Sequence, residues 1–205
     1  MNGSLLALAL LAAAPVPAAP PAAWPLSAEL MIAADAASYA PPDFKRQLAK
    51  HRARLMAGLK DAAAADRGTR DAAARRAAAA RGAREIAQAI RRHGSFADVA
   101  YEAGGLVHEI AAAAWTSAGG FPAADAAAAP KAGRFLGYAA APFADPEVLA
   151  ASLSPAKGAT AAQAYDDAVT VSTRLLAWIW KAAGGDASIA SQHPDSSGPY
   201  PLRGD

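Results

Sequence analysis

Histidine is the residue type with the most chemical potential in this chain, because cysteine is absent from its 205 residues. The lack of cysteine excludes disulfides, thiolate zinc sites and cysteine nucleophiles. The four histidines are His51, His93, His108 and His193. His108 and Glu109 match the first half of the zinc-protease motif H-E-x-x-H, but Ala112 stands where the second histidine is needed. G-x-S-x-G, P-loop and G-x-G-x-x-G sequences are also absent, so none of these catalytic motifs is complete.

Three carboxylates, those of Asp98, Glu102 and Glu109, fall near one face of a predicted helix at positions i, i+4 and i+11. Gly104 and Gly105 interrupt the same helix. Each glycine is destabilising there by roughly 1 kcal/mol relative to alanine. Such a pair indicates either close helix packing or room for a ligand.

Helices must position these side chains, because the composition disfavours strands. Alanine accounts for 64 residues, and it favours helix strongly while adding little area to a core. Apolar periodicity predicts helices over 27–39, 44–59, 96–115 and 161–183. The Ala/Arg-rich segment 66–92 is expected to be helical but weakly packed or exposed, and 119–130 is expected to be a loop. The predicted fold is an all-α, single-domain helical bundle of about five to seven helices.

Residues 1–23 are predicted to be a signal peptide. The apolar run 5–14 is too short to cross a bilayer, which takes about 20 residues, and small residues and prolines follow it. No Lys or Arg precedes the run, so an uncleaved Ala/Pro tail is the alternative. Residues 24–185 would form the helical domain and 186–205 a disordered tail. We therefore expect an exported protein, periplasmic or extracellular, with no transmembrane segment after signal removal.

Positive charge is concentrated in one part of the chain. Residues 43–92 hold 14 of the 20 Lys and Arg residues but 5 of the 18 Asp and Glu residues. This asymmetry predicts an anionic lipid or another polyanion as partner, and a solvated helix face is the alternative. No aromatic residue interrupts the basic run, so sequence-specific nucleic-acid binding is not expected. The candidate phosphate or anion contacts are Arg52, Arg54, Arg91 and Arg92.

Trp24 stands at a plausible cleavage point, and residues 27–36 with the sequence SAELMIAADA follow it. This opening is similar to the pattern W-x(4,5)-H-x-x-I-A-x-x-A, with Glu29 or Leu30 in the place of the histidine. The predicted core helix is similar to one that ends in H-x-x-x-D. His108 matches that histidine, whereas alanine replaces the aspartate four residues later.

Together these stretches resemble the zinc-dependent phospholipase C and single-strand nuclease superfamily, whose members are exported, all-α hydrolases of phosphate esters. In that family the amine and carbonyl of an N-terminal tryptophan bind zinc, which the resemblance assigns to Trp24. Asp61 is a loose match in spacing for a ligand aspartate. Residues 132–136 resemble an H-x-x-F-E ligand segment, with Ala132 and Leu136 in the places of histidine and glutamate.

The metal-ligand remnants implied by the resemblance are therefore His108, Asp61 and Trp24, and no catalytic residue is assigned. A catalytic zinc needs three protein ligands and a water, and a multi-metal phosphoesterase needs about twice as many ligands. We expect a non-catalytic relative, a pseudoenzyme with a degenerate active site, no cofactor and a binding or structural role. Two alternatives stay open: an active phosphodiesterase or phospholipase with a reduced zinc site, and an unrelated exported helical bundle.

Overall fold

The computed structural model describes residues 23–132, 144–153 and 158–187, and its secondary structure there is helical. Its helices are α1 (Leu26–Ser38), α2 (Pro42–Lys50), α3 (Arg52–Ala65), α4 (Ala72–Arg91), α5 (Phe96–Ala118), α6 (Ala123–Ala132), α7 (Pro146–Ala151) and α8 (Ala161–Ala182). The predicted all-α single-domain bundle is confirmed, with eight helices in the described residues. None of the helices in these ranges has the length and apolarity needed to cross a membrane. Nearly all of the predicted signal peptide and tail, and Leu136, lie outside the described residues.

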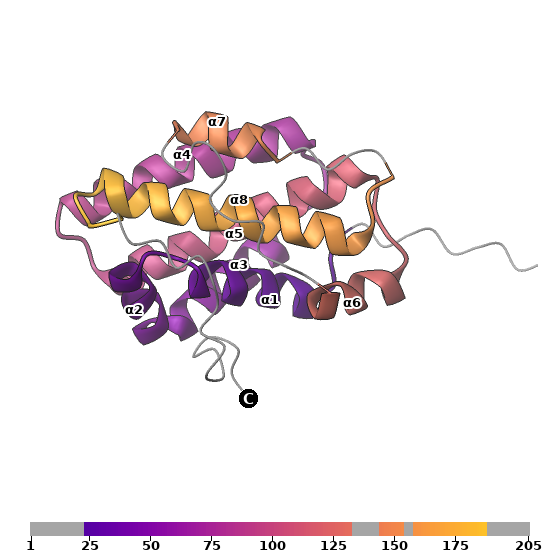
Figure 1. Ribbon diagram of the computed structural model, residues 1–205, viewed down its shortest axis with the longest axis horizontal. Coiled ribbons are helices and arrows are strands. Elements are labelled where there is room, and N and C mark those ends of the chain that lie inside the picture. The colour runs from indigo at the N-terminus through magenta and orange to yellow at the C-terminus, as the bar shows by residue number, and fades with distance from the viewer. Residues whose placement is uncertain (1–22, 133–143, 154–157, 188–205) are drawn as a thin grey trace, which may run out of the picture.

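Helix α5 runs through the middle of the bundle and packs against α3, α4 and α8 (Figure 1). Its buried residues include Val99, Val107 and Ile110, as its apolar periodicity predicts. The Ser95 hydroxyl caps its first turn by accepting a hydrogen bond from the backbone N–H of Ala97 at 3.2 Å. Helix α5 therefore contacts three other helices, α3, α4 and α8, and lies at the centre of the core.

Glycines allow α3 and α5 to approach closely. A Cβ atom added at Gly104 would lie 2.1 Å from the carbonyl oxygen of Leu55, and one at Gly58 would lie 1.9 Å from that of Tyr101. Any larger residue at these two positions would push the helices apart. Close packing is thus confirmed as the reason for glycine at 104, whereas a Cβ at Gly105 would meet no atom within 4 Å.

The Ala/Arg-rich segment is better packed than the sequence predicted. Helix α4 buries Arg75, Ala79, Ala83 and Ile86. Small alanine side chains let α4 lie closely along α5, so few large apolar residues are needed for burial. The expectation that this segment is weakly packed or exposed was wrong.

The region expected to be a loop over 119–130 contains α6. Its alanines favour helix, and Ala126 and Ala129 are buried where α6 packs on α1 and α8. Pro130 lies inside the helix near its C-terminal end, so a proline did not mark the end of the element. The amphipathic segment 44–59 is also divided, because His51 leaves the helical conformation between α2 and α3.

Candidate functional site

A cavity of about 340 Å³ lies between the start of α1 and the second half of α5. Its lining includes Trp24, Glu29, Asp66, Arg75, His108 and Ala112. The Trp24 indole is held in the wall, because its Nε1 donates a hydrogen bond to the carbonyl oxygen of Ala111 at 2.9 Å. The ring also packs edge-on against Trp115, with 5.1 Å between the ring centroids. An aromatic wall and a group of charged side chains therefore face the same space.

His108 lies between two carboxylates and is only 2% exposed. Its Nδ1 is 3.0 Å from Oε2 of Glu29, and its Nε2 is 3.2 Å from Oδ2 of Asp66. Burial alone would lower the pKa of His108, but the hydrogen bond and charge of Glu29, the charge of Glu109 and the Asp66 hydrogen bond raise it above 6.5. The arrangement thus favours a protonated ring that donates to both carboxylates.

The charges continue from Asp66 into α4 and back to α5. Arg75 is 3% exposed, and its Nη1 lies 2.7 Å from Oδ2 of Asp66 and 3.7 Å from Oε2 of Glu109. Burial would raise the pKa of Asp66, but Arg75, the backbone N–H of Gly68 and His108 together hold it well below its usual range. We call the series Glu29, His108, Asp66, Arg75 and Glu109 the ionic chain.

The ionic chain does not fit a zinc ion in its present arrangement. Zinc needs a lone pair on a histidine nitrogen at about 2.0–2.1 Å and several donors around one point. The two nitrogens of His108 instead face Glu29 and Asp66 on opposite sides of the ring. Across the described ranges, no group of three or more His, Asp or Glu side chains is placed to hold a metal ion.

The structure brings together two of the three predicted ligand remnants. Trp24 and His108 line the cavity, and so does Ala112. Asp61 does not line it; its exposed carboxylate accepts a hydrogen bond from the Tyr101 hydroxyl at 2.9 Å. That bond raises the pKa of Tyr101. The segment after Ala132, which includes Leu136, lies outside the described residues.

Asp66 and Arg75 are site residues that sequence reasoning missed, and Glu29 was considered only as a replaced histidine. One local signal was present, because an aspartate two residues before Gly68 is typical of a turn that ends a helix. Gly68 does donate its backbone N–H to Asp66 at 3.0 Å. Nothing in the sequence near Arg75 distinguishes it from the other arginines of its segment.

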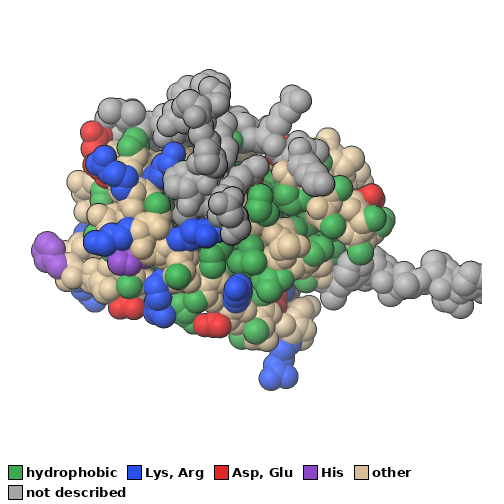
Figure 2. All heavy atoms as spheres, turned by 90° about the horizontal axis from the view of Figure 1, so that it is seen from below, with side chains coloured by type: hydrophobic (Ala, Val, Ile, Leu, Met, Phe, Trp, Pro, Cys, Tyr) green, Lys and Arg blue, Asp and Glu red, His purple; other side chains and the backbone are tan. Residues whose placement is uncertain are grey.

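The predicted anion contacts Arg52 and Arg54 are in the first turn of α3, and Arg91 and Arg92 are at the end of α4. In Figure 1 the start of α3 follows α2 at the end of the bundle where the α4–α5 turn and the end of α8 also lie. Lys and Arg side chains gather at this end in Figure 2. We call Arg52, Arg54, Arg91 and Arg92 the basic end. Arg54 lies 4.7 Å above the Tyr101 ring, and Arg91 Nε donates to the carbonyl oxygen of Ala182 at 2.6 Å.

No family model, curated protein or solved structure matches the chain. The geometry of the cavity and of the charged surfaces is therefore the basis for assigning a function.

Proposed function

We propose that this chain is an exported, non-catalytic protein with a binding or structural role, built on a scaffold that resembles the zinc-dependent phospholipase C and single-strand nuclease superfamily. The main support is that Trp24, Glu29, His108 and Ala112 surround one cavity. The resemblance matches Trp24, His108 and Ala112 to metal-ligand positions of that family, and it places either Glu29 or Leu30 at a further ligand histidine. Ala112 and Glu29 would then be replacements. A former metal site in which some ligands have been replaced would have this arrangement of retained and replaced residues around one cavity.

The ionic chain supplies the physical reason for a loss of catalysis. A hydrolytic zinc needs neutral imidazole nitrogens and an open position for water. Here Glu29 and Asp66 favour the imidazolium form of His108, which has no lone pair to offer a metal. Alanine at position 112 has neither charge nor donor atom. A salt-bridged chain has thus taken the space in which metal ligands would meet.

Metal analysis combined with a hydrolysis assay tests this proposal. The purified chain is incubated with zinc, passed through a desalting column, and analysed for bound zinc and for turnover of a phosphodiester. We expect much less than one zinc per chain and no turnover above that of a His108→Ala variant. One or more tightly held zinc ions with turnover that the variant lacks would instead support the active, reduced-site hydrolase.

The binding role is proposed to involve anionic lipid at the basic end. Arg54, Arg91 and Arg92 are exposed, and Arg52 is partly exposed. Each Lys or Arg near an anionic membrane contributes roughly 1 kcal/mol at moderate ionic strength. The four side chains are therefore sufficient for reversible docking on such a surface.

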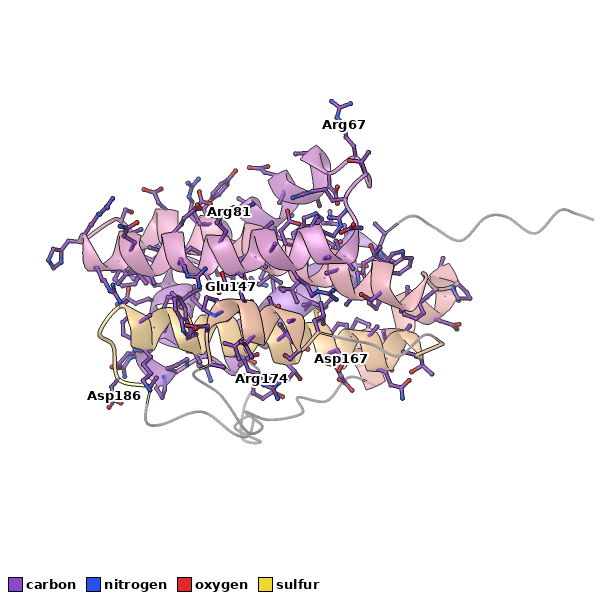
Figure 3. The ribbon with its side chains drawn as sticks, turned by 90° about the horizontal axis from the view of Figure 1, so that it is seen from above. Arg67, Arg81, Glu147, Asp167, Arg174 and Asp186 are labelled. Atoms are coloured by element: carbon purple, nitrogen blue, oxygen red, sulfur yellow. The ribbon has the colours of Figure 1, made fainter. Side chains whose placement is uncertain are left out.

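Vesicle co-sedimentation tests the lipid proposal. We expect binding to vesicles that contain phosphatidylglycerol, no binding to pure phosphatidylcholine, and release by salt. The double variant Arg91→Gln/Arg92→Gln removes about 2 kcal/mol and should bind about thirtyfold more weakly. The matched control is Arg67→Gln/Arg81→Gln, which removes the same charge elsewhere; both side chains are labelled in Figure 3, where Arg67 extends away from the helices. Equal weakening by both double variants would contradict a localised basic end.

Export is a separate part of the proposal. If residues 1–23 are a signal peptide, the exported protein should begin at Trp24 or close to it. Mass spectrometry of protein recovered from outside the cytoplasm measures this directly. Recovery of only the uncleaved chain from the cytoplasm would contradict export.

A further inference from the structure

Two of the three histidines in the described ranges are sequence neighbours of arginines of the basic end. His51 joins α2 to α3 and precedes Arg52, and His93 follows Arg92 in the α4–α5 turn. His93 is exposed and His51 is half-buried, whereas His108 is buried in the ionic chain. Histidine side chains lie among Lys and Arg side chains in Figure 2. The basic end is therefore accompanied by a side-chain type whose charge changes between pH 5 and pH 8.

An aromatic cluster joins the elements that carry these two histidines. Trp180, near the end of α8, stacks on Phe44 of α2 with 5.2 Å between the ring centroids. The centroid of the same Trp180 ring system lies 6.3 Å from that of Phe96, the first residue of α5. His51 directly follows the helix that carries Phe44, and His93 precedes Phe96 by three residues. Both imidazoles therefore belong to one packed end of the bundle (Figure 1).

The backbone of His93 has a conformation that favours glycine. Its φ is 57°, and it lies in the turn that ends α4. The backbone N–H of His93 donates to the carbonyl oxygen of Ile90, and that of Gly94 donates to that of Ala89, both at 2.9 Å. In this pattern of two hydrogen bonds, the position of His93 is usually glycine, because a side chain there is less favourable. Since His93 is exposed, packing does not explain the histidine, and its charge is the remaining property of interest.

The other charged groups at this end are mostly cations. They are Lys45, Arg46 and Lys50 of α2, the four arginines of the basic end, and Lys181 of α8. The carboxylates are those of Asp43 of α2, Asp98 and Glu102 of α5, and Asp186 after α8 (Figure 3). Asp43 pairs with Arg46, and Asp98 pairs with Arg54. The pKa of the neighbouring Tyr101 is raised, chiefly by its hydrogen bond to Asp61, so its hydroxyl stays neutral.

We propose that the basic end docks on an anionic lipid surface more tightly at mildly acid pH, because His51 and His93 then carry positive charge. The inference rests on the function proposed for the basic end and adds its regulation. Two further charges would join the four arginines, and each one strengthens the attraction to anionic headgroups. A protein outside the cytoplasm meets the pH of its surroundings. Acid would therefore favour the docked state, and neutral pH would favour release.

Vesicle co-sedimentation of the full chain at pH 8 and pH 5.5, at constant ionic strength, tests the inference. The vesicles contain phosphatidylglycerol, whose phosphodiester is ionised at both pH values. Each cation near such a surface changes the affinity roughly fivefold, so we expect roughly twentyfold tighter binding at pH 5.5. Equal binding at the two pH values would overturn the inference but leave the proposed docking intact. No binding at either pH would overturn both.

Two double variants distinguish the histidines from the arginines. His51→Gln/His93→Asn should bind with about the same affinity at both pH values, and asparagine suits the left-handed backbone at position 93. Arg91→Gln/Arg92→Gln should bind more weakly at both pH values but should still bind more tightly in acid. Circular dichroism at each pH checks that the variants are folded. Full tightening in acid by the folded histidine double variant would overturn the inference, because the titrating group would then lie elsewhere.

A permanent charge at one of the two positions gives an independent test. His51→Arg should bind roughly fivefold more tightly than the unmodified chain at pH 8, because its guanidinium is charged at every pH used. Its additional tightening between pH 8 and pH 5.5 should be smaller than that of the unmodified chain, since one titrating group has been removed. If the folded variant binds no more tightly at pH 8, position 51 does not face the lipid surface and the inference is wrong.

Discussion

Replacement of His108 by leucine should leave the buried carboxylate of Glu29 without a compensating charge. Glu29 is 2% exposed, and its carboxylate oxygen Oε2 lies 3.0 Å from Nδ1 of His108. Removing one member of a buried ion pair costs roughly 3–5 kcal/mol, because the other charge loses its compensation. Asp66 still has Arg75 as a partner at 2.7 Å, so only Glu29 loses its compensating charge. We therefore expect the lower end of that range, about 3 kcal/mol, for His108→Leu.

A double-mutant cycle separates this effect from simple loss of packing. Glu29→Leu should cost less, about 1–2 kcal/mol, since His108 keeps Asp66 and is able to release its proton. The double variant Glu29→Leu/His108→Leu should be more stable than His108→Leu alone, because replacing a buried pair by apolar residues is often neutral. Urea denaturation at pH 6 measures all four free energies of unfolding. If the double variant is no more stable than His108→Leu, an unpaired Glu29 charge is not what destabilises the single variant.

Three further predictions concern protonation and helix packing. The pKa of His108 is raised in the folded chain. Its contribution to the free energy of unfolding is therefore complete below pH 6.5 and is lost as the pH rises through the pKa of the folded state. Urea denaturation at increasing pH should show this loss, and the loss should be absent in His108→Leu. Gly104→Ala should destabilise by at least about 2 kcal/mol through its backbone clash, whereas Gly105→Ala should stabilise by up to about 1 kcal/mol, as measured by thermal unfolding. Arg75→Leu should be most destabilising at neutral pH, and its difference from the unmodified chain should shrink below about pH 4, because the Asp66 contribution that depends on a lowered pKa is then lost in the unmodified chain as well.

Helix α5 illustrates how much of the fold is predictable from the sequence. Ser95 is a favourable N-cap, an apolar stripe follows it, and Gly119 ends the helix in a left-handed conformation with φ 87°. Each of these signals is local and acts within one or two helical turns. The same local rules failed for α6, because Pro130 and the preceding glycines suggested a loop where buried alanines favour a helix.

The candidate site was only partly predictable, because its contacts join distant parts of the chain. Trp24 and His108 were identified through a resemblance, and both line the cavity. The partner of His108 at Nδ1 is 79 residues away, and the partner at Nε2 is 42 residues away. Helix periodicity places a residue on a face but does not say which distant residue meets that face. Arg75, and the contact between Asp66 and His108, therefore became visible only with the tertiary structure.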